Sequence, residues 1–120
     1  RPVNAAQRPL VIQYDVQHRS GWECGGAYVK LLPEGTDLRQ VSDQTDYVLM
    51  FGPDRCGPGT DRIHFILRHR HPRTGRVTEH RLVDPPAAKD TRDAVLYTLI
   101  VHPDGGVEIF VDMNRVRKAS

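Results

Sequence analysis

The sequence has no long apolar run, little net charge and no internal repeat. The longest apolar run covers residues 47–51, which is too short to cross a bilayer. Lys and Arg number 17 against 15 acidic residues, so the formal net charge is +2. That balance makes no electrostatic case for a nucleic acid or a membrane surface as partner. A chain of 120 residues forms one domain at most.

Cysteine is scarce as well, and no Cys-x-x-Cys motif is present. The two cysteines, Cys24 and Cys56, both lie beside glycines. They fit a single structural disulfide, which would stabilise the fold by roughly 3–4 kcal/mol through loop closure and indicate an oxidising compartment. Two free buried thiols in a reducing compartment are the alternative, and the spacing alone leaves both open.

What the chain does contain is alternation of apolar and polar residues, with no sustained helical period. Asp104-Gly105 between β-branched runs is a strong hairpin signal, and a second turn is expected at 71–75. The expected strands cover residues 10–17, 27–32, 46–51, 62–69, 76–82, 95–101 and 106–112, with loops at 33–45 and 84–93. Six or seven short strands without helices predict an all-β sandwich or jelly roll.

Several runs of residues occur together in an order and spacing typical of one family. These runs are Arg8–Val16, Glu23–Leu32, Met50–Gly57, His64–Ile66 and Leu96–Val101. Through them the sequence resembles the calnexin/calreticulin family of lectin chaperones, from about Arg8 to Asp112. Ala27 and the turn at 71–75 favour the calnexin branch without excluding the other.

The resemblance implies a concanavalin A-like jelly roll, with residues 1–120 as one lectin domain segment. It also implies a disulfide between Cys24 and Cys56. The expected role is a non-catalytic chaperone in the lumen of the endoplasmic reticulum, with a membrane anchor in the parent protein if the calnexin branch applies. The chaperone would hold newly made glycoproteins by monoglucosylated high-mannose N-glycans.

Five residues match sugar-contact positions of the family: Tyr28, Lys30, Tyr47, Met50 and Glu79. Tyr28 and Lys30 are two apart, so both leave the same face of a strand and offer hydroxyl and ammonium donors. Met50 would form an apolar surface under the sugar ring, and the Glu79 carboxylate would accept bonds from neighbouring hydroxyls. Tyr47 and Met50 are three apart, which places them on opposite faces of a regular strand unless a bulge intervenes.

The resemblance also implies parts of the domain that these 120 residues lack. The missing parts are its first segment, a proline-rich arm and the final strands, so we expect an incomplete sandwich with an open edge or exposed apolar face. Structural calcium is expected in the intact family domain, with its ligands outside this segment. An oxidoreductase of the protein-disulfide-isomerase family is expected to bind through the absent arm. No metal site is expected here, since His64, His69 and His71 do not follow a zinc pattern.

Two other functions compete with the lectin hypothesis. A glycoside hydrolase on a similar jelly roll needs two carboxylates about 5–10 Å apart across the scissile bond. Glu108 and Asp112 share strand parity, but they lie too far apart along one strand for that geometry unless it bends. The other alternative is a chaperone that binds unfolded polypeptide through exposed apolar strands, independently of glycans.

Overall fold

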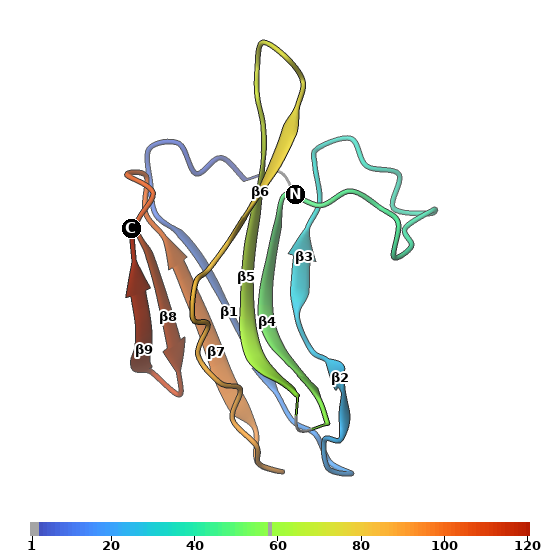
Figure 1. The fold of residues 1–120 in the computed structure, drawn as a ribbon, viewed down its shortest axis with the longest axis vertical. Coiled ribbons are helices and arrows are strands. Elements are labelled where there is room, and N and C mark those ends of the chain that lie inside the picture. The colour runs from blue at the N-terminus through green and yellow to red at the C-terminus, as the bar shows by residue number, and fades with distance from the viewer. Residues whose placement is uncertain (1–2, 58) are drawn as a thin grey trace.

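The structure is a computed structural model that describes residues 3–57 and 59–120. It contains nine strands in two antiparallel sheets, and the described residues include no helix, so the all-β prediction is confirmed (Figure 1). The strands are β1 Leu10–Val16, β2 Cys24–Gly26, β3 Val29–Leu31, β4 Leu49–Cys56, β5 Thr60–Arg70, β6 Val77–Arg81, β7 Val95–Val101, β8 Val107–Val111 and β9 Asn114–Ala119.

One sheet has the strand order β1-β7-β8-β9. Alternation along β1 turns its even-numbered residues, from Leu10 to Val16, toward the second sheet, as the sequence pattern predicts. From the same sheet Tyr97, Leu99 and Ile109 are fully buried. Burial of each large apolar side chain stabilises the fold by about 1.5–3 kcal/mol, so this inner face supplies much of the core.

The second sheet has the order β2-β4-β5-β6, and β3 pairs with β4 beside β2. Phe51 and Ile63 point inward from β4 and β5 and complete the core. Because successive side chains alternate, the even-numbered residues of β4 and β5 face outward, away from the first sheet. This outward face is the surface on which the predicted sugar contacts lie.

The structure has more strands than the sequence predicted. β2 was not expected as a separate strand, and β4 starts at Leu49 and runs to Cys56 rather than covering 46–51. β9 was missed altogether, although Asp112 and Met113, both with positive φ, make a tight turn that pairs it with β8. Non-glycine residues seldom adopt positive φ, so no turn signal in the sequence marked this hairpin.

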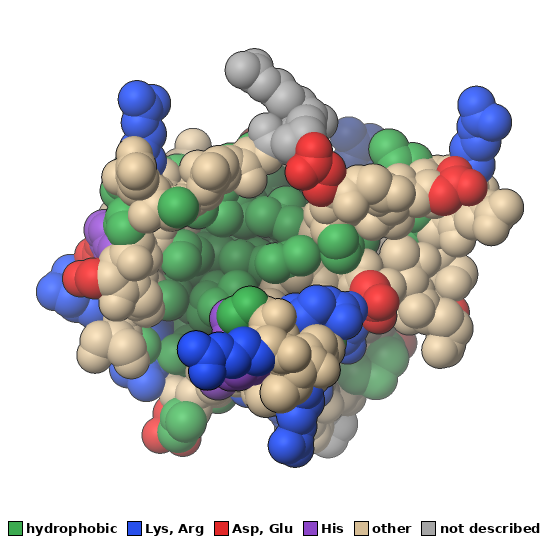
Figure 2. All heavy atoms as spheres, turned by 90° about the horizontal axis from the view of Figure 1, so that it is seen from above, with side chains coloured by type: hydrophobic (Ala, Val, Ile, Leu, Met, Phe, Trp, Pro, Cys, Tyr) green, Lys and Arg blue, Asp and Glu red, His purple; other side chains and the backbone are tan. Residues whose placement is uncertain are grey.

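The sandwich is open at the end that carries the β5–β6 hairpin. There an apolar hollow of about 480 Å³ separates the sheets, and Figure 2 shows it as a recessed hydrophobic area. Its apolar lining includes Phe65, Leu67, Leu82, Val101 and Val107. This opening agrees with the exposed apolar face that the sequence led us to expect.

The predicted disulfide is present between Cys24 and Cys56, which lie opposite each other on β2 and β4. The Gly57 N–H donates to the Glu23 carbonyl and closes the ladder just beyond it. The bond therefore fastens the short β2 strand to the edge of the sheet. Within the described residues, no helix is long and apolar enough to cross a membrane.

Candidate carbohydrate-binding site

The outward face of the second sheet brings together side chains from several strands. Lys30 on β3 lies opposite Met50 on β4, and Met50 lies opposite Ile66 on β5. Arg68 on β5 lies opposite Glu79 on β6. Directly paired residues share a face, and Ile66 and Arg68 are two apart on β5, so register alone places all five side chains on this face in neighbouring rows.

Tyr47 and Met50 lie together on this face, which resolves the parity conflict in the sequence. Tyr47 precedes β4, and Val48 interrupts the regular ladder because its N–H donates to the Leu31 carbonyl while its own carbonyl accepts from Arg68. Tyr47, Met50 and Ile66 form a small apolar cluster of their own. An irregularity at the start of the strand, rather than regular alternation, therefore sets the direction of Tyr47.

Three cation–π contacts join Tyr28 and Tyr47 to Lys30 and Arg68. The Lys30 ammonium lies 6.0 Å from the centroid of the Tyr28 ring and 5.2 Å from that of Tyr47. The Arg68 guanidinium stacks on Tyr47 at 3.7 Å, where such a contact is worth about 0.5–1 kcal/mol or more. Arg68 thus covers the ring, and Tyr47 is only 7% exposed. A sugar that contacts Tyr47 must displace Arg68 or approach from the side that it leaves open.

Glu79 is held between two arginines. Its carboxylate accepts from the Arg68 Nε at 3.2 Å and from the Arg81 Nε at 2.8 Å. The hydrogen bond from Arg81, aided by the one from Arg68, lowers the pKa of Glu79, so the carboxylate is ionised at neutral pH. Arg81 contacts Oε1 through both Nε and Nη2, whereas Oε2 accepts only from Arg68, so Oε2 keeps a lone pair that can accept a sugar hydroxyl.

Two further polar residues, His64 and Asp54, lie on this face beside the five predicted contacts. His64 Nε2 lies 3.0 Å from the Asp54 carboxylate, and the His64 ring meets the Tyr28 ring edge-on at 5.8 Å. Asp54 has the same parity as Met50, but the sequence-based strand ended at residue 51 and excluded it. A longer strand would have placed Asp54 on the outward face. Arg68 could not be found from local signals, because its role depends on two other strands.

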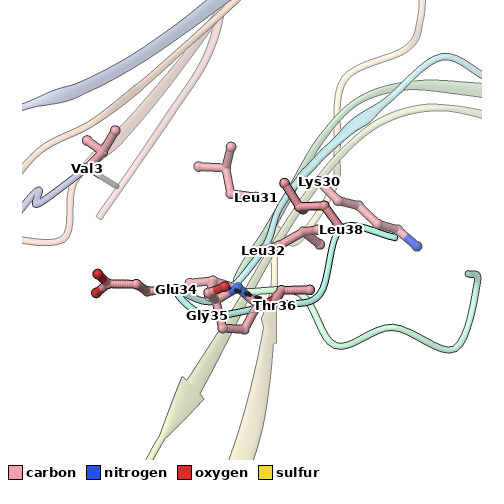
Figure 3. Close-up of a pocket in the computed structure, with 10 residues that line it drawn as sticks. Val3, Lys30, Leu31, Leu32, Glu34, Gly35, Thr36 and Leu38 are labelled. Atoms are coloured by element: carbon pink, nitrogen blue, oxygen red, sulfur yellow. Dashed lines mark hydrogen bonds between the residues drawn. The ribbon is translucent and has the colours of Figure 1, made fainter. Parts of the chain in front are cut away.

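The larger cavities lie beside this face rather than on it. One of about 460 Å³ surrounds β3 and the loop at 33–38, where Thr36 donates to the Pro33 carbonyl (Figure 3). Lys30 and Leu31 extend to opposite sides of β3 in that view, with Leu31 toward Val3. A smaller hollow of about 190 Å³ adjoins Tyr47 and Arg68. The face itself is open, which suits an extended glycan more than an enclosed small ligand.

The carboxylates considered for hydrolysis lie elsewhere, near the other sheet. Glu108 accepts from Arg115 and lies 2.7 Å from His102, while Asp112 accepts from Lys89 and from the Leu96 N–H. These partners lower the pKa of both carboxylates, chiefly the bond to His102 for Glu108 and that from the Leu96 amide for Asp112. Both are anionic ends of surface ion pairs, and neither has the raised pKa that a general acid needs.

Metal ligands do not gather anywhere in residues 3–57 and 59–120. No group of three or more His, Cys, Asp or Glu side chains there is arranged to hold an ion. The described residues therefore do not fit the calcium site expected of the intact family domain, and no role for calcium is assigned to them.

Comparison with known proteins decides the family. The calreticulin family profile matches residues 1–120, the whole chain. The chain belongs to the calreticulin family. It is 45% identical to the calnexin homolog of Aspergillus fumigatus over 94% of the chain, and 42% identical to human calmegin over 100% of the chain. It also matches the solved globular domain of T. cruzi calreticulin with a TM-score of 0.86 and 33% identity.

Family membership accounts for the fold, and the chain spans only part of the length of its relatives. The chain covers 20% of each of these two curated relatives, and 43% of the solved calreticulin domain. The likeness confirms the concanavalin A-like jelly roll. Members of the family are lectin chaperones rather than enzymes.

Proposed function

We propose that this chain is the glycan-binding part of a lectin chaperone in the lumen of the endoplasmic reticulum. Its ligand would be the monoglucosylated high-mannose N-glycan of newly made glycoproteins. One observation carries the proposal: Tyr28, Lys30, Tyr47, Met50 and Glu79, chosen from the sequence, lie on one open face of one sheet. An unbroken series of contacts joins the aromatic and charged members, from Glu79 through Arg68 and Tyr47 to Lys30 and Tyr28.

The chemistry of this face suits a hexose. Tyr28 is 38% exposed and offers both a ring surface and a hydroxyl, while Lys30 offers three donors between two aromatic rings. Met50 and Ile66 form an apolar surface between them, and Glu79 on β6 is an ionised acceptor on the side of the face opposite to Tyr28 and Lys30. Donors, an acceptor and apolar surface together can bind the hydroxyls and the C–H face of one sugar ring.

A calorimetric titration tests the proposal. The protein should bind a monoglucosylated high-mannose glycan more tightly than the same glycan without glucose. Lys30→Ala should weaken that binding by about 10-fold, because a charge-assisted hydrogen bond is worth about 1.5 kcal/mol or more. Lys118→Ala, an exposed lysine on the other sheet, is the matched control and should bind as the wild type does. Equal affinity for the two glycans would contradict the proposal.

A second candidate function is glycan-independent binding of unfolded polypeptide. The apolar hollow between the sheets, open at one end of the sandwich, favours it. Suppressed aggregation of an unglycosylated client, unaffected by Lys30→Ala, would support this mode. An oxidoreductase of the protein-disulfide-isomerase family stays a prediction for the parent protein, because the arm expected to recruit it is not in this sequence.

A further inference from the structure

β2 and β3 continue one register against β4, with a break between them. Gly26 lies opposite Asp54 and Val29 opposite Phe51, so Ala27 lies opposite Pro53 and the next residue opposite Gly52. The Ala27 N–H donates to the Pro53 carbonyl at 2.9 Å. Proline has no N–H to return that bond, so the sheet supplies no ladder donor to the Ala27 carbonyl.

Tyr14 supplies the missing donor from the opposite sheet. Its side chain leaves β1, crosses the core and donates its hydroxyl to the Ala27 carbonyl oxygen at 2.8 Å, with the Phe51 carbonyl oxygen 3.3 Å away. Burial, with a smaller contribution from Tyr97, raises the pKa of Tyr14, so the hydroxyl keeps its proton and remains a donor. Gly52 makes the approach possible, because a Cβ there would collide with the Tyr14 hydroxyl and lie 2.6 Å from the Tyr28 Cα.

The Ala27 carbonyl belongs to the peptide group that leads into Tyr28. This group is planar, so a bond that fixes the direction of the carbonyl also fixes the N–H and Cα of Tyr28. We propose that Tyr14 is a positioning residue of the sugar-binding face, where its hydroxyl holds the backbone from which Tyr28 projects. The inference rests on the proposed glycan-binding function of that face.

Tyr14→Phe removes the hydroxyl and leaves the ring in place. Loss of one hydrogen bond of typical strength should weaken binding of the monoglucosylated glycan by about fivefold. Tyr97→Phe is the matched control, because it also removes a hydroxyl from a core tyrosine, whose ring centroid is 6.1 Å from that of Tyr14. The Tyr97 hydroxyl meets the backbone of Lys89 instead, so its removal should leave glycan affinity within about twofold of the wild type.

Adding Pro53→Ala to the Tyr14→Phe variant should restore glycan affinity. That recovery would not occur if Tyr14 served only the stability of the core. Alanine restores an N–H opposite the Ala27 carbonyl, so the double variant should regain most of the lost affinity. Its global stability should not recover, since Pro53 is a fully buried residue and the substitution removes core volume. Hydrogen–deuterium exchange provides a readout without ligand: Tyr14→Phe should accelerate exchange at the amides of residues 27–29 more than in β7.

These measurements separate the inference from the proposed function. If the wild type binds and Tyr14→Phe binds equally well, the positioning role is overturned. It is also overturned if affinity falls but Pro53→Ala restores none of it, or if exchange at residues 27–29 does not change. If the wild type binds no monoglucosylated glycan, the proposed function fails. The exchange result alone then decides whether Tyr14 holds the Tyr28 backbone.

Discussion

Gly26→Ala tests the placement of Tyr28 on the sugar-binding face. The Tyr28 ring lies over Gly26, where a Cβ would be 2.6 Å from Cδ1 of the ring and closer still to Cε1. An ordinary contact begins at 3.4 Å, and Cε1 is the nearest ring atom, so the ring must move by about 1 Å or more. The rest of the substitution is benign, because Gly26 is exposed and its φ lies outside the left-handed region.

The magnitude follows from what the displaced ring would lose. A shift of about 1 Å takes a hydroxyl hydrogen bond from its optimum near 2.7–2.8 Å to beyond useful range. Loss of that bond and of part of the ring contact costs about 1–2 kcal/mol, or about a 5- to 30-fold rise in Kd. The fold should not suffer, since alanine in a strand is more favourable than glycine by roughly 0.5–1 kcal/mol.

Calorimetric titration with the monoglucosylated glycan, paired with thermal unfolding, measures both effects. Gly59→Ala is the control, because a Cβ there meets no atom within 4 Å and Gly59 lies between β4 and β5 at the same end of the sheet as β2. We expect Gly26→Ala to bind weakly with an unchanged or higher Tm, and Gly59→Ala to bind normally. Affinity within about twofold of the wild type in a stable Gly26→Ala protein would refute the assignment of Tyr28 to the sugar.

Three further predictions concern the disulfide, Glu79 and the response to acid. The double variant Cys24→Ser/Cys56→Ser should lose up to about 4 kcal/mol of unfolding free energy in a urea titration, because the bond spans 32 residues of sequence; an unchanged midpoint would contradict this. Glu79→Gln should weaken glycan binding by about 5- to 10-fold without lowering Tm, since it removes a charged acceptor; equal affinity would remove Glu79 from the site. Bonds from His102 and Arg115 lower the pKa of Glu108 below its ordinary 4.5. The ionised Glu108 therefore contributes fully to stability above pH 4.5, and this contribution is lost as the pH falls through the lowered pKa of the folded protein. Melts between about pH 6 and pH 2 should therefore show a shallower acid limb for Glu108→Gln, and identical limbs would count against this ion pair.

Much of the fold could be predicted because its signals are local. Alternation in β1, and Asp-Gly between the apolar runs of β7 and β8, specify strands and a hairpin within a few residues of sequence. The identity of the predicted sugar contacts came from motifs, and Tyr28 and Lys30 were placed on one face by their spacing alone. The predicted strand boundaries were wrong where the sequence has no local signal, as at the extension of β4 to Cys56 and at the turn before β9.

The sequence by itself determined most of the strands and which residue types could bind a sugar, because side-chain alternation and motif spacing are properties of the chain over short distances. Only the tertiary structure decided that Tyr47 and Met50 share a face, that Arg68 joins Tyr47 to Glu79, and that Tyr14 from one sheet satisfies a carbonyl of the other. The Arg68 contacts join three segments of one sheet, and Tyr14 reaches the Ala27 carbonyl only after the two sheets pack. A distant donor that replaces a missing N–H leaves no periodic trace in the sequence, so geometry alone reveals it.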